Sequence, residues 1–104
     1  MKTEYLVAEM APKGIYPMLT ATVVPRPIAW VTSVSAEGVL NLAPHSFFTV
    51  ASARPPMIQF TSVGGEKDTL RNIRATGGEF TVSMVTEPLT EAANVTSVDA
   101  PHGR

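Results

Sequence analysis

The sequence predicts a mainly β fold, a small barrel with two short helical insertions, in a single domain over residues 1–104. Short runs rich in β-branched and aromatic residues follow one another along the chain, and Gly or Pro separates most of them. The order differs from the regular alternation of strands and long helices that a parallel sheet requires. With 104 residues, the chain is long enough for one small domain and too short for two.

The composition is globular, with little charged surface. Apolar residues make up 44% of the chain and charged residues 16%, below the typical charged fraction of about 25%. The 8 Lys and Arg against 9 Asp and Glu give a formal net charge of -1. We therefore expect some apolar surface to meet a partner, and we expect no nucleic acid or anionic membrane to be attracted by charge.

Disulfides, thiolate metal ligands and a cysteine nucleophile are excluded because the chain contains no cysteine. The apolar stretch at residues 5–8 is too short for a signal-peptide core. The most apolar stretch, residues 21–34, is interrupted by Pro25, Arg26 and Pro27, and it falls short of the about 18 apolar residues of a membrane helix. We predict a cytoplasmic protein without a membrane partner.

The first predicted strands form a hairpin. Residues 1–20 contain scattered Pro and Gly, which predicts an irregular lead-in. The β-branched and aromatic run at residues 28–35, a turn that ends at Gly38 and the apolar run at residues 39–43 predict two paired strands. Pro44 cannot donate to a sheet ladder, so we expect it to end or bend the second strand.

Three further strands and two helices follow. Residues 47–51 and 57–61 are apolar runs separated by Arg54-Pro55-Pro56, and the alternation at residues 80–85 predicts a fifth strand. Between the fourth and fifth strands, Asp68 is predicted to be the N-cap of a helix of about nine residues that ends at Gly77. Pro88 predicts the start of a final short helix. Five strands leave an exposed edge, so barrel closure requires another strand, another subunit or further chain.

Two candidate segments for chemistry lie near the hairpin. In Pro25-Arg26-Pro27, the prolines hold Arg26 in extended backbone, although a surface arginine at a strand entrance is the more common case. In residues 41–48, a strand break at Pro44 would expose backbone groups to a planar heteroaromatic ligand, and a purely structural bend explains the pattern as well. His45 can donate to a ligand or act as an acid, whereas a lone loop histidine is more often solvated.

The other two segments lie in the second half. Gly64-Gly65 followed by Lys67 and Thr69 at a helix start is a candidate phosphate cradle, since ammonium, hydroxyl and helix dipole all favour an anion. The alternative is a solvated helix face on which Asp68 only caps the helix. Residues 94–96 match a glycosylation acceptor, which we attribute to chance in a protein without an export signal.

The pattern of titratable residues favours chemistry that a bound cofactor supplies. The two histidines, His45 and His102, are far apart and have no metal-ligand spacing. There is also no Ser-His-Asp order with flanking glycines. If the protein is an enzyme, we expect a cofactor to carry the reaction.

Taken together and in this order, the segments PRPIAWV, NLAPHSFF, RPPMIQF, KDTLRNI and GEFTVSMV resemble the flavin reductase-like family of FMN-binding split barrels. The resemblance runs from about Tyr16 to Val98, nearly the whole chain. It implies a Greek-key split β-barrel that works as a homodimer and binds FMN, or alternatively FAD, in a groove at the subunit interface. Family members are roughly twice as long, in keeping with ordinary domain sizes, so the chain corresponds to the N-terminal portion of the domain and ends where the second half of the barrel would begin.

The resemblance also implies a set of site residues, and no metal ligand among them. The flavin ring would lie against the strand that carries Trp30 to Ser33 and against the bend from Asn41 to Ser46. The phosphate would lie at the helix start, at residues 67–69. His45 is the candidate catalytic residue, as a polar group over the ring. The implied cofactor-binding residues are Trp30, Val31, Thr32, Ser33, Asn41, Ala43, Pro44, Ser46, Lys67, Asp68 and Thr69.

The implied reaction is hydride transfer from NADH or NADPH to flavin, with a flavin-dependent oxygenase as a possible recipient of the reduced flavin. Such a protein needs to orient two cofactors more than it needs a strong acid or base. Two alternatives remain open. One is a flavoprotein that holds FMN tightly and transfers electrons or reduces a metal, and the other is a noncatalytic fragment of a flavin-binding domain.

Overall fold

The computed structural model describes residues 3–10, 13–64 and 66–98, and it confirms a mainly β chain with short helices. All five predicted strands are present, with ends shifted by one or two residues. The strands are β1 (Ala29–Val34), β2 (Leu40–His45), β3 (Phe48–Ala53), β4 (Pro56–Phe60) and β5 (Thr81–Met84). The helices are α1 (Val7–Met10), α2 (Ile15–Thr22), α3 (Asp68–Ala75), the 3-10 turn η1 (Glu87–Leu89) and α4 (Thr90–Val95).

The strands form two open antiparallel sheets in the described part of the chain. One has the order β2-β1-β5, and the other is the β3-β4 hairpin. In the three-stranded sheet, Val31 of the central strand pairs with Ala43 on β2 and with Val82 on β5. The predicted exposed edges are therefore present at β2 and β5.

The prediction that Pro44 ends or bends the second strand is wrong. β2 continues through Pro44, which lies opposite Trp30 in the register, and it ends at His45. β2 is the edge of its sheet in the described chain. A proline nitrogen that faces away from the neighbouring strand removes no ladder hydrogen bond, so an edge strand tolerates it.

The predicted irregular lead-in is also wrong, because residues 1–20 contribute α1 and most of α2. Pro17 is the third residue of α2, within the first turn, where backbone N–H groups have no helical acceptor and a proline costs no hydrogen bond. Arg26 is not a simple surface arginine, since its Nη1 donates to the carbonyls of Thr20 and Val23, both at 2.7 Å, at the end of α2. No helix in the described residues has the length and apolar character to cross a membrane.

The ends of α3 correct one prediction and confirm another. The N-cap is Lys67 and not Asp68, which is the first helical residue and pairs with Arg71 at 3.6 Å. The predicted stop at Gly77 is confirmed: Gly77 has a φ of 74°, and the Gly78 N–H donates to the Ile73 carbonyl at 2.8 Å. This is a Schellman end, in which glycine supplies the left-handed conformation.

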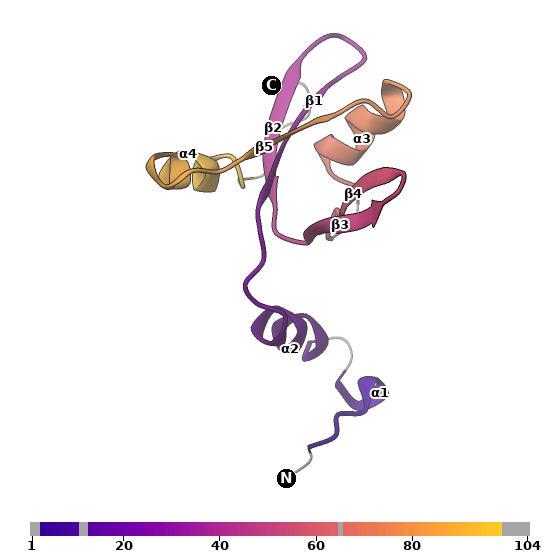
Figure 1. The fold of residues 1–104 in the computed structure, drawn as a ribbon, viewed down its shortest axis with the longest axis vertical. Helices are drawn as coiled ribbons and strands as arrows, with labels where there is room; N and C mark the ends of the chain where they lie inside the picture. Colours follow the sequence, from indigo (N-terminus) through magenta and orange to yellow (C-terminus); the bar gives the residue numbers. More distant parts are fainter. Residues whose placement is uncertain (1–2, 11–12, 65, 99–104) are drawn as a thin grey trace.

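β1 carries the core, with its alternate side chains on opposite faces. On one face, Ser33 accepts a hydrogen bond from Asn72 of α3 at 3.2 Å. On the other, Trp30 Nε1 donates to the hydroxyl of Thr96, just after α4, at 3.0 Å. Figure 1 shows α3 and α4 on the two sides of the three-stranded sheet. The buried apolar residues of the described chain are Ala29, Trp30, Val31 and Ala93.

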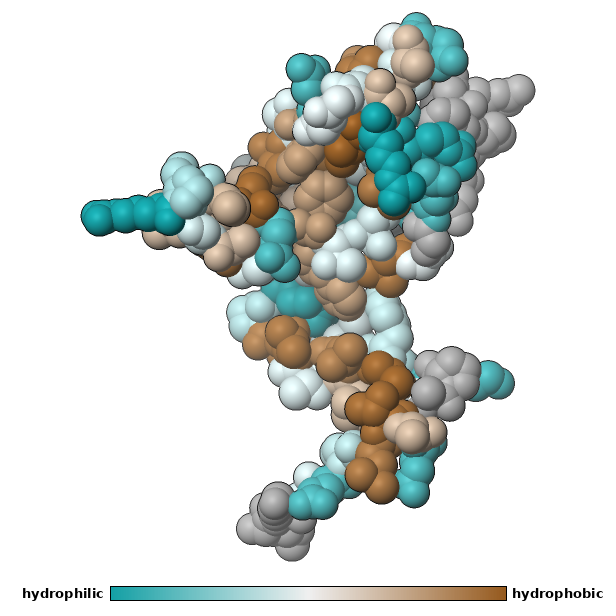
Figure 2. All heavy atoms as spheres, turned by 90° about the vertical axis from the view of Figure 1, so that its right-hand side faces the viewer, coloured by the Kyte–Doolittle hydropathy of each residue, from teal (hydrophilic) through white to brown (hydrophobic). Residues whose placement is uncertain are grey.

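Much apolar surface stays exposed around this small core. The radius of gyration is 16.0 Å, whereas a compact domain of this length has about 13 Å. The segment with α1 and α2 extends away from the sheets (Figure 1), and Figure 2 shows apolar side chains along it. Exposed large apolar residues include Tyr5, Leu6, Val7, Leu19, Val23 and Val24 on this segment and Val50, Met57 and Ile58 on the β3-β4 hairpin.

Replacing Thr96 with valine tests the bond that joins α4 to the sheet. We expect the free energy of unfolding to fall by about 1 kcal/mol, because the buried Trp30 N–H loses its acceptor at nearly constant side-chain volume. Urea denaturation followed by circular dichroism measures the change. Thr90→Val is the matched control, since Thr90 at the start of α4, like Thr96 just after its end, also donates to a backbone carbonyl three residues before it. Combined with Trp30→Phe, Thr96→Val should be sub-additive and Thr90→Val additive, and additivity in both would contradict the assignment.

Candidate functional site

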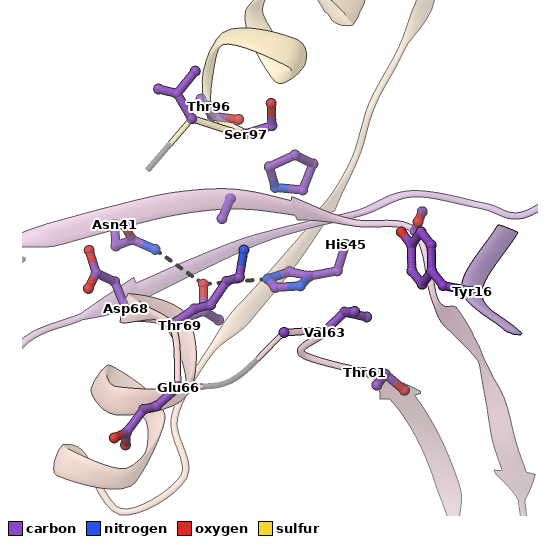
Figure 3. A pocket seen from close by; sticks show the side chains of 16 residues that line it. Tyr16, Asn41, His45, Thr61, Val63, Glu66, Asp68, Thr69, Thr96 and Ser97 are labelled. Atoms are coloured by element: carbon purple, nitrogen blue, oxygen red, sulfur yellow. Dashed lines mark hydrogen bonds between the residues drawn. The ribbon is translucent and has the colours of Figure 1, made fainter. Parts of the chain in front are cut away.

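A pocket of about 500 Å³ lies at the edge of β2 (Figure 3), within the range of about 300–1,000 Å³ found for small-molecule sites. Its wall extends around both faces of the strand: Asn41 and His45 lie on the α3 side, and Thr96 and Ser97 lie on the α4 side. The lining residues are Tyr16, Asn41, Ala43, Pro44, His45, Ser46, Thr61, Val63, Gly64, Glu66, Lys67, Asp68, Thr69, Thr96, Ser97 and Val98.

The edge of β2 offers backbone hydrogen-bonding groups. The Ser35 N–H donates to the Val39 carbonyl at 2.9 Å, which makes this a hydrogen-bonded pair of the β1-β2 ladder. Because such pairs alternate in an antiparallel ladder, the backbone groups of Leu40, Leu42 and Pro44 face away from β1. No other strand of the described chain pairs with this edge. The sequence predicted unpaired groups from a strand break at Pro44, whereas the structure provides them through the edge of a continuous strand.

The start of α3 brings anion-binding chemistry to the same pocket. The first N–H groups of an α-helix have no helical acceptor, and the helix dipole places partial positive charge there. The N-cap Lys67 makes no capping hydrogen bond with its side chain. Thr69, the second residue of the helix, lines the pocket although it is only 2% exposed. An ammonium, a hydroxyl and a helix N-terminus together favour a phosphate.

Two carboxylates line this end of the pocket, and each has an arginine nearby. Asp68 lies 3.6 Å from Arg71, and Glu66 lies 3.1 Å from Arg74. The positive charges of the arginines offset the repulsion that these carboxylates would otherwise exert on an anion. Both pairs are solvent-exposed, so they tune the local potential more than they stabilise the fold.

Three polar side chains form a hydrogen-bonded group at the bottom of the pocket. Asn41 Nδ2 donates to the Thr69 hydroxyl at 3.2 Å, and His45 Nε2 lies 3.4 Å from the same oxygen (Figure 3). The imidazole also packs against the Phe60 ring of β4 at 4.7 Å between centroids. The Thr69 hydroxyl is therefore held by two strand residues that are both on β2.

Burial lowers the pKa of His45 below its ordinary value of 6.5, and the positive charge of Lys67 lowers it further. A hydrogen bond to the backbone of Thr61 acts in the opposite direction. Desolvation and a nearby cation both disfavour the imidazolium. The side chain is consequently neutral at pH 7, with one ring nitrogen that donates and one that accepts.

A family model for a flavin reductase-like domain matches residues 20–104. The chain belongs to the flavin reductase-like family. Curated relatives include uncharacterised proteins of Deinococcus radiodurans, 44% identical over 97% of this chain, and of Halalkalibacterium halodurans, 47% identical over 86% of it. The chain spans about half the length of these relatives, 48% and 44% respectively.

Two solved structures of oxidoreductases are similar to this member of the flavin reductase-like family. Nitrilotriacetate monooxygenase component B from Bacillus cereus superposes with a TM-score of 0.88 at 38% identity, over 100% of this chain and 52% of its own. The 2-nitrobenzoate 2-nitroreductase from Pseudomonas fluorescens gives a TM-score of 0.85 at 34% identity, over 97% of this chain and 50% of its own.

The structure brings eight of the predicted site residues to the pocket and keeps four away from its lining. The eight are Asn41, Ala43, Pro44, His45, Ser46, Lys67, Asp68 and Thr69. The other four, Trp30, Val31, Thr32 and Ser33, form β1 behind β2, and most of their side chains are buried under α3 or α4. Their contact with a flavin ring stays a prediction.

Several lining residues were not predicted from the sequence. Tyr16 packs against Phe47, with 5.9 Å between the ring centroids, and this contact holds it at the pocket. The guanidinium carbon of Arg26 lies 5.7 Å from the centroid of the same Phe47 ring. Thr96, noted only as part of a glycosylation pattern, is the acceptor for Trp30 and lines the pocket with Ser97. Gly65 and His102 lie outside the described residues. Within the described residues, no group of three His, Asp or Glu side chains is placed to hold a metal ion.

The lowered pKa of His45 predicts a pH-dependent stability. Below about pH 6.5 the unfolded chain binds a proton at His45 more readily than the folded chain does, so the free energy of unfolding falls as the pH drops from 6.5 toward the folded pKa. His45→Gln should remove this contribution to the pH dependence of the free energy of unfolding between about pH 7.5 and 5.5. Urea denaturation at several pH values measures it, and equal slopes in both proteins would contradict the buried, neutral imidazole.

Proposed function

We propose that this chain is part of an FMN-binding oxidoreductase that transfers hydride from NADH or NADPH to flavin. The observation that supports it is one pocket that combines an anion-binding helix start with an unpaired strand edge, in a chain of the flavin reductase-like family. These two features suit the two parts of a flavin mononucleotide, a phosphate and a planar polar ring.

The phosphate end is the part of the pocket formed by Lys67 and Thr69. The ammonium group of Lys67 supplies positive charge. The first N–H groups of α3 and the positive end of its helix dipole lie at the same helix start. Arg71, 3.6 Å from the Asp68 carboxylate, offsets part of the negative charge that this carboxylate brings next to the proposed phosphate position. These donors fit a phosphate monoester.

The ring end is the edge of β2. The outward carbonyls and N–H groups of this edge match the alternating donors and acceptors along the polar side of an isoalloxazine ring. Pro44 and Ala43 add small apolar surface against which a ring can pack. We propose that β1, with Trp30, Val31, Thr32 and Ser33, supports this site by fixing the position of β2.

A bound flavin would accept the hydride and supply the redox chemistry. The residues of this chain would then have three tasks: to hold the phosphate, to align the ring along β2 and to exclude water from one ring face. Tyr16, exposed at the pocket rim, is placed to contact an aromatic second substrate. Hydride transfer needs orientation of the two partners above all, which is the task that these residues would perform.

We propose that the full domain is a split barrel closed by chain beyond this half and assembled as a homodimer. The open sheets and the exposed apolar residues of the β3-β4 hairpin and the α2 segment support this, because such surfaces are normally covered. The similarity to a monooxygenase component B supports a flavin-dependent oxygenase as the recipient of the reduced flavin.

A noncatalytic flavin-binding half-domain is the second candidate, favoured by the fact that the chain spans about half of its relatives. The purified chain, given FMN and either NADH or NADPH, tests both candidates. Oxidation of the nicotinamide, followed by its absorbance, supports the enzyme and contradicts the noncatalytic half-domain. Flavin binding without oxidation shows that this half captures the cofactor and that any turnover needs residues outside it, and failure to bind flavin contradicts both candidates. Flavin that stays with the protein through gel filtration while an added acceptor is reduced would support a tightly bound electron carrier.

Replacing Lys67 with methionine tests the phosphate end. We expect FMN to bind about tenfold more weakly or worse, because a charge-assisted contact of about 1.5–3 kcal/mol is lost. Riboflavin, which lacks the phosphate, should bind both proteins equally, as measured by quenching of flavin fluorescence. Lys13→Met, which removes an exposed lysine outside the pocket, is the matched control and should leave both affinities unchanged. An equal loss of affinity for FMN and for riboflavin in Lys67→Met would contradict a phosphate contact.

A further inference from the structure

We propose that His45 is a positioning residue that acts through the Thr69 hydroxyl, so that the pocket takes up a proton at His45 when it binds a phosphate monoester. This inference rests on the proposed binding of FMN. It assigns His45 to the phosphate end of the pocket, whereas the sequence placed it over the flavin ring. The observation behind it is that Asn41 and His45 both contact the Thr69 hydroxyl.

The Thr69 hydroxyl has one hydrogen to donate and two lone pairs to accept with. Asn41 Nδ2 occupies one lone pair. His45 Nε2, at 3.4 Å, interacts either with the second lone pair or with the hydrogen, depending on its own protonation. Because Thr69 is 2% exposed and His45 9% exposed, water cannot easily replace either interaction.

In the neutral state, the hydroxyl hydrogen is directed to His45. The imidazole interacts with the Thr61 backbone as well as with Thr69. We assign the ring proton to Nδ1, where the Thr61 carbonyl can accept it, which leaves Nε2 as an acceptor. The Thr69 hydroxyl then donates to Nε2 and has no hydrogen left for a ligand in the pocket.

In the protonated state, the hydrogen bond between the two side chains reverses. Nε2 carries a proton and donates it to the Thr69 oxygen, whose two lone pairs are then used by His45 and Asn41. The hydroxyl hydrogen is released toward the pocket that Thr69 lines. A phosphate oxygen accepts this hydrogen, and the proton that completes the exchange comes from solvent.

The charges around His45 favour the same coupling. Lys67 precedes α3 and disfavours the imidazolium while no anion is present. The other titratable groups that line the pocket are Glu66 before α3, Asp68 on α3 and Tyr16 on α2; the lining residues from β2, Thr61 to Gly64 and the segment after α4 add none besides His45. A bound phosphate offsets the repulsion between Lys67 and an imidazolium, so it stabilises the protonated state.

Proton uptake and phosphate affinity are linked. If phosphate binding raises the pKa of His45, then protonation of His45 strengthens phosphate binding by the same factor. Each unit of pKa change corresponds to about a tenfold change in affinity across the interval between the two pKa values. As the pH falls through this interval, proton uptake at His45 favours FMN binding, and protonation of the phosphate itself, whose second pKa is about 6, opposes it. Riboflavin, which lacks the phosphate, should show neither effect.

Nuclear magnetic resonance titration of the His45 imidazole tests the inference directly. The purified chain is titrated alone, with saturating FMN and with saturating riboflavin, and the His45 signal is assigned by its loss in His45→Gln. We expect FMN to raise the pKa of His45 by about one unit or more, and riboflavin to leave it nearly unchanged. An increase of less than a few tenths of a unit with FMN would overturn the proposal.

Two variants of Thr69 separate the hydroxyl effect from simple charge attraction. Thr69→Ser keeps the hydroxyl, and it should keep the full increase in the pKa of His45. Thr69→Val keeps the shape, and it should lose at least half of the increase at saturating FMN. Equal increases in Thr69→Val and the parent chain would show attraction by charge alone and would overturn the role of Thr69. If FMN binds none of these proteins, the proposed function fails and the inference fails with it.

Discussion

The pairing of β1 on both sides is the constraint on which the rest of the molecule depends. β1 joins β2 to β5, and its side chains reach α3 through Ser33 and α4 through Trp30. A central strand can do this because successive residues point to opposite faces. The core that results is small, so each of these contacts bears a large share of the stability. It also has a consequence for function, since β2 is left at an edge with its outer backbone groups available.

The candidate site follows from that arrangement. The α3 helix packs against β1, and this brings Thr69 within hydrogen-bond distance of Asn41 on the neighbouring strand, 28 residues earlier in the chain. The same packing directs the helix start toward the edge of β2. An anion-binding group and a row of backbone donors and acceptors therefore share one pocket. Neither would be a specific site alone, because helix starts and strand edges are common, whereas their convergence in one pocket suits the proposed ligand, which has a phosphate and a planar polar portion.

The parts of the fold that were predicted from the sequence are those with local causes. The five strands follow from β-branched runs between Gly and Pro, and the end of α3 at Gly77 follows from a left-handed conformation that glycine adopts readily. The two errors about proline have different causes. Pro44 continues a strand because that strand is an edge, which is a tertiary cause, whereas α2 tolerates Pro17 because Pro17 lies in its first turn, which is a local one. Lys67 and Thr69 were predicted from their spacing, but the approach of Tyr16 and Thr96 to the pocket depends on contacts with Phe47 and Trp30 that no local pattern contains.

The pocket and the exposed apolar surface lie on different parts of this half, and the proposed function would use them for different tasks. The residues of the proposed phosphate end and the strand edge all lie in this half, and they are held by hydrogen bonds within it. The apolar residues of the β3-β4 hairpin and of the α2 segment face outward from the same half. Binding of a phosphate needs only local donors, whereas excluding water from a ring and placing a second substrate on it require cover on the open side. If the proposed flavin site is correct, cofactor capture and catalytic turnover depend on different parts of the full domain, with capture determined by the residues between Asn41 and Thr69.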